Sequence, residues 1–234
     1  MPAYTLQQRL FSEFLGSAFL LATVVGSGIM AETLPGSNVA VQLLCNSTAT
    51  GAILYVLITM LGPISGAHFN PAVTLAFCMR GEIGRNEAAL FVLMQIAGGV
   101  CGVLATHLMF DQSVMQISLK LRDGPALWFS EIIATFGLVA TILLTLKANA
   151  SAVPTSVALY IAAAYWFTAS TSFANPAVTI ARGFSDTFAG INPANVPAFI
   201  VAQLVGAVLA VYVCRFLLGQ KRAKVSTKAP AAAE

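Results

Sequence analysis

The sequence predicts an all-α membrane protein with six transmembrane helices and two re-entrant half-helices arranged as an inverted repeat. Three observations lead to this fold class. Hydrophobic residues make up 58% of the 234 residues and charged residues 9%, whereas soluble domains carry about 25% charged residues. Six apolar stretches have the length of roughly 20 residues that crosses a bilayer core. The sequence Asn-Pro-Ala-Val-Thr occurs twice, at residues 70–74 and 175–179.

The first half of the chain carries three apolar spans after a short polar lead. These spans cover about residues 10–31, 39–61 and 88–110. We expect the second span to end at Gly62-Pro63, since proline disrupts a helix. The third span contains Gly98 and Gly102, a GxxxG pair that lets helix backbones approach closely in lipid.

The second half repeats this plan after the longest polar connection, residues 111–126. Its spans cover about residues 127–146, 153–169 and 196–218. Glu13 opens the first span as Glu131 opens the fourth, and Gln95 in the third span matches Gln203 in the sixth. Three spans per half is an odd number, so the second copy enters the membrane from the opposite side. The expected organisation is one transmembrane channel domain over residues 1–234, with repeat 1 at about 5–110, repeat 2 at about 126–218 and a cytoplasmic tail at 219–234.

Each Asn-Pro-Ala sequence is expected to start a short helix, because asparagine is a preferred N-cap and proline fits the first helical turn. The residues of these central motifs are Asn70, Pro71, Ala72, Asn175, Pro176 and Ala177. The stretches before them suit a loop that dips into the membrane. Two half-helices entering from opposite faces meet near the midplane, where their positive N-terminal ends repel cations and their asparagines donate to a passing oxygen. The backbone carbonyls expected to line the pore belong to Gly66, Ala67, His68, Thr171 and Phe173.

The distribution of lysine and arginine predicts the orientation. Nine basic residues fall on the side that holds both termini and three on the other, so both termini are expected in the cytoplasm of a multi-pass inner-membrane protein. The net charge of +3 comes from connections and the tail, which argues for contact with the lipid bilayer and against a nucleic-acid partner. No nucleophile–base pair, metal-binding cluster or phosphate loop is present in the sequence, so we expect neither an enzyme nor a cofactor.

The two inverted Asn-Pro-Ala motifs and the paired glutamates and glutamines resemble the aquaporin, or major intrinsic protein, family over essentially the whole chain. The resemblance implies a homotetramer in which every subunit has its own pore. It also implies a structural role for Glu13, Glu131, Gln95 and Gln203, with the glutamates holding the backbone of the dipping loops. The alternative for Glu13 and Glu131 is a proton-coupling pair, since carboxylates inside a membrane are commonly functional.

The family narrows its pore at four positions, which by spacing from the asparagines correspond here to Thr50, Ala163, Ser172 and Val178. Val178 stands where family members usually have arginine. Water-selective members tend to have an aromatic ring and a histidine where Thr50 and Ala163 stand. All four residues are small or medium and uncharged, so we expect a wide constriction. The pattern resembles bacterial aquaglyceroporins associated with arsenic resistance, and predicts a passive channel for glycerol-type polyols and metalloid acids such as arsenite, with water.

Several assignments stay open at this point. Arg182 either replaces the missing arginine one helical turn away or is a surface residue that pairs with Asp186. His68 either lines the pore statically or gates it by protonation. The competing functions are a water-selective aquaporin, an ion-coupled secondary transporter that uses Glu13 and Glu131, and a junctional membrane protein with a closed pore.

Overall fold

The computed structural model describes residues 4–36 and 38–219. In this part of the chain six helices are long and apolar enough to cross a membrane, and there are no strands. The long helices are α1 (Leu6–Thr33), α2 (Val39–Ser65), α4 (Arg85–Met109), α5 (Pro125–Ala148), α6 (Val153–Phe167) and α8 (Val196–Leu217). The two half-helices are α3 (Pro71–Arg80) and α7 (Pro176–Arg182), and single 3₁₀ turns precede α6 and α8 (Ala150–Ala152 and Pro193–Asn195). The predicted fold class is confirmed. The expected cytoplasmic tail, apart from Gly219, lies outside the described residues.

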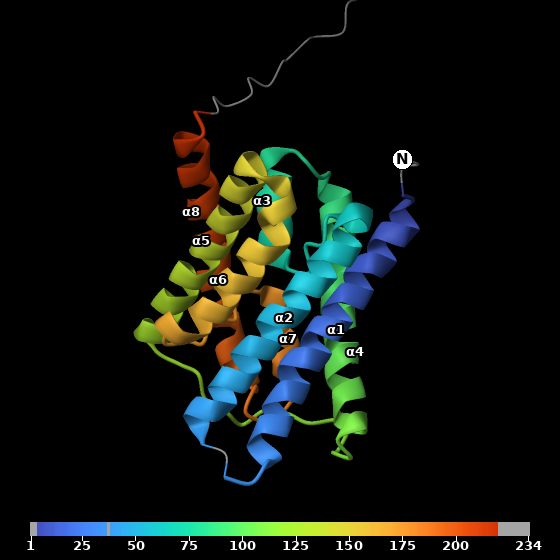
Figure 1. Cartoon of the computed structure of the whole chain (residues 1–234), viewed down its shortest axis with the longest axis vertical. Helices are drawn as coiled ribbons and strands as arrows, with labels where there is room; N and C mark the ends of the chain where they lie inside the picture. The colour runs from blue at the N-terminus through green and yellow to red at the C-terminus, as the bar shows by residue number, and fades with distance from the viewer. Residues whose placement is uncertain (1–3, 37, 220–234) are drawn as a thin grey trace, which may run out of the picture.

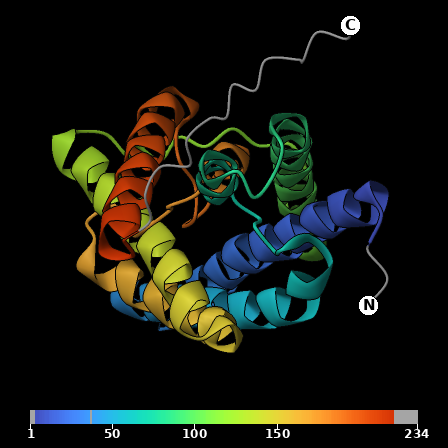
Figure 2. The ribbon, with the colours of Figure 1, turned by 90° about the horizontal axis from the view of Figure 1, so that it is seen from above.

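The long helices surround the two half-helices, which enter the interior from opposite ends (Figures 1 and 2). Helix α1 packs against α4 as α5 packs against α8, and α2 packs against α6. The described chain begins and ends at the same end of the molecule, which we call the terminal end (Figure 1). Helix α3 lies toward this end and α7 toward the opposite end, which we call the far end.

Glycines bring the helices of each half together at matching positions. A Cβ atom added at Gly98 of α4 would lie 2.1 Å from the carbonyl oxygen of Phe14 in α1. A Cβ atom added at Gly206 of α8 would lie 2.4 Å from the carbonyl oxygen of Ile132 in α5. Gly102 makes a second close approach between α4 and α1. Side chains at these positions would push the helices apart, so both helix pairs depend on the missing side chain.

The end of α2 differs from the prediction. The helix passes through Gly62-Pro63 and ends at Ser65, before Gly66 adopts the left-handed conformation with φ of 92°. The N–H of Gly66 still donates to the carbonyl of Gly62 at 3.0 Å. A proline so close to the C-terminus costs only one helical hydrogen bond, whereas the left-handed glycine satisfies the last carbonyls and stops the helix.

Candidate pore

The half-helices begin as the asparagine caps predict. Asn70 Oδ1 accepts a hydrogen bond from the N–H of Ala72 at 2.9 Å, and Asn175 Oδ1 accepts from the N–H of Ala177 at 2.9 Å. Asn175 Oδ1 also lies 3.3 Å from the N–H of Val178, which donates to it. In each cap the side-chain oxygen of asparagine binds the helix N-terminus, so the side-chain Nδ2 can donate to another group.

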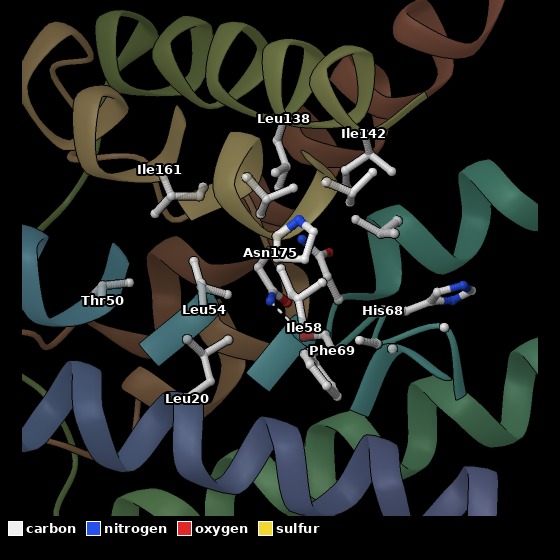
Figure 3. Close-up of a pocket in the computed structure, with 18 of the residues that line it drawn as sticks. Leu20, Thr50, Leu54, Ile58, His68, Phe69, Leu138, Ile142, Ile161 and Asn175 are labelled. Carbon is white, nitrogen blue, oxygen red and sulfur yellow. Dashed lines mark hydrogen bonds between the residues drawn. The ribbon is translucent and has the colours of Figure 1, made fainter. Parts of the chain in front are cut away.

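The two asparagines also link the halves of the chain. Asn70 Nδ2 donates to the carbonyl of Ala174 at 2.7 Å, and Asn175 Nδ2 donates to the carbonyl of Phe69 at 2.8 Å. The second of these bonds is drawn in Figure 3, with Asn175 in the middle of the cavity. One N–H of each amide is used in this way, so the other is free to donate to a solute.

The dipping loops have an unusual backbone at equivalent places. Ala67 and Phe69 have φ of 50° and 48°, and Ser172 and Ala174 have φ of 50° and 47°. These residues lie three and one positions before the two asparagines. Left-handed non-glycine residues cost of order 1–3 kcal/mol each and persist only where surrounding contacts hold them.

A buried carboxylate supplies those contacts in the first half. Glu13 of α1 is completely buried and accepts hydrogen bonds from the N–H groups of His68 at 3.0 Å and Phe69 at 2.7 Å. It also accepts from Ser65 Oγ at 2.6 Å and from Gln95 Nε2 at 2.7 Å. The first dipping loop is thus tied to two of the long helices.

Glu131 of α5 does the same in the second half. Its carboxylate accepts from the N–H groups of Phe173 and Ala174, both at 2.9 Å, and from Gln203 Nε2 at 2.6 Å. Each glutamine reaches one step further, because Gln203 Nε2 also donates to Thr179 as Gln95 Nε2 donates to Thr74. The two networks are equivalent, as expected of an inverted repeat.

A cavity of about 550 Å³ runs past both asparagines. Its lining includes residues at both ends of the molecule, such as Ser151 at the terminal end and Arg182 at the far end. Apolar side chains from α1, α2, α5 and α6 form most of its wall (Figure 3): Leu20, Leu54, Ile58, Leu138, Ile142 and Ile161. Polar residues line it at the two dipping loops and at both ends, with Thr59, Glu82 and Ser151 toward the terminal end.

The loop residues expected to contribute carbonyls mostly lie at the cavity. Gly66, Ala67, His68 and Phe173 are part of its lining, whereas Thr171 is not. His68 Nδ1 lies 3.1 Å from Thr74 Oγ1, and the imidazole stacks on the ring of Phe77 with 4.6 Å between centroids. These contacts hold the ring in place.

Three of the four predicted constriction residues, Thr50, Ser172 and Val178, line the far end of the cavity. Ala163 does not, and this assignment was wrong. Its side chain is exposed on the outer face of α6, whereas Tyr165, two residues further on, is 3% exposed and lines the cavity. Two residues turn a helix by about 200°, so they face opposite sides. Ala163 was assigned by its spacing from Asn175. That spacing crosses the non-helical loop after α6, so it does not show which side of α6 faces the cavity.

The far end of the cavity thus presents three hydroxyl groups and one isopropyl group. Tyr165 Oη and Thr50 Oγ1 are 3.2 Å apart and share a hydrogen bond. Ser172 Oγ is buried and has no hydrogen-bond partner among the described residues. We refer to Thr50, Tyr165, Ser172 and Val178 as the constriction ring.

Arg182 is not a surface arginine paired with Asp186. Its side chain is 2% exposed, lines the cavity, and donates through Nε to the carbonyl of Ala189. Its guanidinium carbon lies 3.4 Å from the centroid of the Phe173 ring. Asp186 Oδ1 accepts from the N–H of Leu119 at 2.9 Å instead. The position four residues after Val178 suggested proximity to the pore, but the stacking on Phe173 depends on loop geometry that the sequence does not show.

Among residues 4–36 and 38–219, no three His, Cys, Asp or Glu side chains are grouped so that they could hold a metal ion. The cavity therefore offers hydrogen-bonding groups and apolar surface rather than a metal centre.

Comparison with known proteins agrees with this architecture. The family model described as Major intrinsic protein matches residues 2–169 and 146–233. Aquaglyceroporin AqpS of Rhizobium meliloti (strain 1021) is 51% identical over 230 residues, which cover 98% of each chain. Aquaporin NIP1-4 of Oryza sativa subsp. japonica is 33% identical over 53% of this chain and 44% of its own. The X-ray structure of the aquaglyceroporin from Plasmodium falciparum superposes with a TM-score of 0.71 at 19% identity, covering 89% of this chain and 95% of that one.

Proposed function

This chain belongs to the major intrinsic protein family, and from that premise we propose that it is a passive channel for small neutral solutes. The solutes are glycerol-type polyols and metalloid acids such as arsenous acid, with water passing as well. The observation that carries this proposal is the constriction ring, in which an isopropyl group and three hydroxyls surround the far end of a cavity of about 550 Å³. The name of the relative AqpS as an aquaglyceroporin points the same way.

The cavity suits solutes that have both apolar and hydrogen-bonding surface. Its wall is mainly leucine, isoleucine and valine, so it offers water few partners along most of its length. A polyol or a hydroxylated metalloid turns its carbon or metalloid side toward this wall and its hydroxyls toward the free N–H groups of Asn70 and Asn175. Ser172 Oγ, which lacks a partner among the described residues, offers a further hydrogen bond at the ring.

A water-selective channel is the closest alternative. It requires a narrow constriction with strong hydrogen-bonding groups, whereas Val178 contributes neither a charge nor a donor. The chemistry of the constriction ring therefore favours solutes larger than water.

An ion-coupled transporter is less well supported. Such a protein needs titratable groups at the transport site, but Glu13 and Glu131 accept hydrogen bonds from loop N–H groups and lie outside the cavity lining. Their contacts support a structural role in shaping the two loops.

We further infer that the protein is a homotetramer of the inner membrane with both termini in the cytoplasm. The excess of basic residues in the sequence segments expected on the side of both termini, nine against three, supports this orientation by the positive-inside rule. Native mass spectrometry of the detergent-purified protein tests the tetramer. Labelling from either side of the membrane tests the orientation, with one cysteine introduced at Lys147 or Lys120 after the four native cysteines are replaced by serine.

The experiment that tests the transport function is stopped-flow light scattering on proteoliposomes challenged with water, glycerol and arsenous acid. The parent protein is expected to pass all three. Val178→Arg is expected to suppress glycerol and arsenous acid by roughly tenfold or more while sparing water, since a guanidinium would fill and charge the ring. A parent protein that passes only water, or vesicles no faster than empty ones in glycerol and arsenous acid, would contradict the proposed solute class.

A further inference from the structure

The far end of the molecule carries three basic residues that form no ion pair with an acidic residue in the described part of the chain. Lys120 and Arg122 lie in the connection between α4 and α5, and Arg182 is the last residue of α7. This connection crosses the far end of the molecule (Figure 1). Among the described residues the ion pairs are Arg9 with Glu87 and Arg80 with Glu82, both toward the terminal end. The three cations therefore keep their charge uncompensated by direct contact with a carboxylate.

Three consecutive backbone carbonyls, those of residues 188–190, hold the three cations in place. The first accepts from Lys120 Nζ at 2.7 Å, the second from Arg182 Nε, and the third from Arg122 Nε at 2.8 Å. Carbonyl dipoles stabilise cations without cancelling their net charge. The backbone thus fixes the positions of three positive charges close together.

Phe173 orients both guanidinium groups. The guanidinium carbon of Arg182 lies 3.4 Å and that of Arg122 lies 5.0 Å from the centroid of its ring. Both distances fall within the range in which a cation is attracted by an aromatic ring. The ring itself is fixed, because it packs edge-on against Phe199 and the N–H of Phe173 is bound by Glu131.

Arg182 is the member of this cluster that reaches the cavity. It lies one helical turn beyond Val178 on α7, and both residues line the cavity. Its Nε donates to the carbonyl of Ala189, and neither Nη atom makes a hydrogen bond to a described residue. The acidic groups nearby are held by backbone N–H groups, since Glu32 accepts from Phe188 and Asp186 accepts from Leu119. Glu131, the carboxylate behind Phe173, likewise accepts from the N–H groups of Phe173 and Ala174 rather than from an arginine.

From this geometry we propose that the channel selects solutes at two successive levels. The constriction ring limits size, and Arg182 with Arg122 excludes cations one helical turn further out. This inference rests on the proposed transport of neutral solutes. A single arginine at the position of Val178 would tie both properties to one side chain. Here the charge comes from a residue one helical turn beyond Val178, so the ring itself can stay uncharged while protons and metal cations still meet a positive barrier.

The test is the ratio of proton to glycerol permeability in proteoliposomes, with a pH-sensitive dye inside for the first and light scattering for the second. Arg182→Gln is expected to raise this ratio by roughly tenfold or more, because a fixed charge beside a low-dielectric passage dominates ion entry. Arg182→Lys keeps the charge and is expected to stay near the parent. Arg85→Gln, an exposed basic residue at the start of α4, is the matched control and is expected to change nothing.

A second arm tests the separation of the two levels. Val178→Leu narrows the ring without adding charge, so it is expected to lower glycerol permeability and leave the proton permeability per channel unchanged. A clear rise in proton permeability with Val178→Leu would contradict separate levels.

The inference is overturned if Arg182→Gln and Arg122→Gln both keep the parent ratio. If Arg182→Gln is not recovered as a folded protein, Arg122→Gln decides by the same criterion. A parent that passes no glycerol contradicts the transport proposal but leaves this test intact, since the proton permeabilities of the parent and Arg182→Gln can still be compared.

Discussion

The two re-entrant segments, residues 65–80 and 170–182, each contain a contact between the same two positions, but the residues at those positions differ in chemistry. In the first, the ring two residues before the asparagine is His68, and it stacks on Phe77, seven residues after the asparagine, at 4.6 Å between centroids. In the second, the same two positions hold Phe173 and Arg182, whose guanidinium carbon lies 3.4 Å from the ring centroid. The geometry is kept, and the partner changes from an aromatic ring to a cation.

Several other contacts are the same in the two segments. A serine hydroxyl accepts from the N–H two residues on in both, Ser65 from Ala67 at 3.1 Å and Ser170 from Ser172 at 3.2 Å. The third residue after each asparagine is a valine, and the fourth is a threonine bound by a glutamine. The shared residues determine how the loops fold, and the exchanged pair determines the charge at each end of the cavity.

The largest expected effect comes from removing the shared carboxylates. Glu13→Leu and Glu131→Leu should each destabilise the protein by about 3–5 kcal/mol, because two loop N–H groups and a glutamine amide lose their acceptor in a buried site. Thermal unfolding of the detergent-purified variants measures this. Glu82→Gln, at an exposed ion pair, is the control and should cost about 1 kcal/mol or less. If only one of the two variants were destabilised by this amount, the two halves would not be equivalent.

The distances at the close helix contacts predict which half of the protein is destabilised more by an added methyl group. An added Cβ meets a carbonyl oxygen at 2.1 Å for Gly98 and at 2.4 Å for Gly206. Gly98→Ala should therefore destabilise more than Gly206→Ala, each by about 1–3 kcal/mol as for other overpacked sites. Gly62→Ala, whose Cβ meets nothing within 4 Å, is the helical control, measured by the same unfolding assay. The reverse ranking would mean that α5 and α8 adjust less easily than α1 and α4.

A smaller effect is expected at the far end alone. Tyr165→Phe removes one hydroxyl of the constriction ring and leaves Thr50 without its partner. The ratio of glycerol to water permeability should fall by about twofold to fivefold, the size of one net hydrogen bond. Tyr160→Phe is the matched variant on the same helix, because Tyr160 Oη donates to the carbonyl of Ala134 and lies outside the cavity lining. If both variants changed the permeability ratio equally, the change would result from altered packing of α6 and not from the constriction ring.

The smallest effect is a pH dependence confined to the far end. Burial, with repulsion from Arg122 and Arg182, lowers the pKa of Lys120 to about 8. Lys120 therefore carries a positive charge below this pH and loses it as the external pH rises through it. The sodium leak of the parent should rise modestly, by about twofold, between external pH 7 and pH 9, because one of three charges is removed.

Lys120→Met is expected to abolish that pH dependence and to show the higher leak at both pH values. The measurement is sodium flux into proteoliposomes at fixed internal pH. A leak that keeps the same pH dependence in Lys120→Met would assign it to another group.

The sequence was sufficient for the features that repeat or that follow a helical period. The asparagine caps, the six spans and the order of the inverted repeat could be predicted because each depends on local preferences or on apolar length. The end of α2 was missed by a few residues, since Pro63 is tolerated where the helix is about to stop at Gly66.

The sequence was insufficient where a non-helical loop sets the rotation of a helix. Ala163 and Tyr165 are two residues apart, yet one faces outward and the other lines the cavity, and nothing in their composition shows which. Arg182 could be placed one turn beyond Val178, but its stacking on Phe173 arises from left-handed residues such as Ser172.

The crossed asparagine bonds have a consequence for how the protein is made. Asn70 and its acceptor are separated by 104 residues, and Asn175 and its acceptor by 106. While the ribosome is still synthesising the second half, Asn70 Nδ2 and the carbonyl of Phe69 lack these partners at membrane depth. The nascent first half must therefore stay hydrated or shielded by the insertion machinery until α7 arrives. Completion of the pore is thus coupled to synthesis of the second dipping loop.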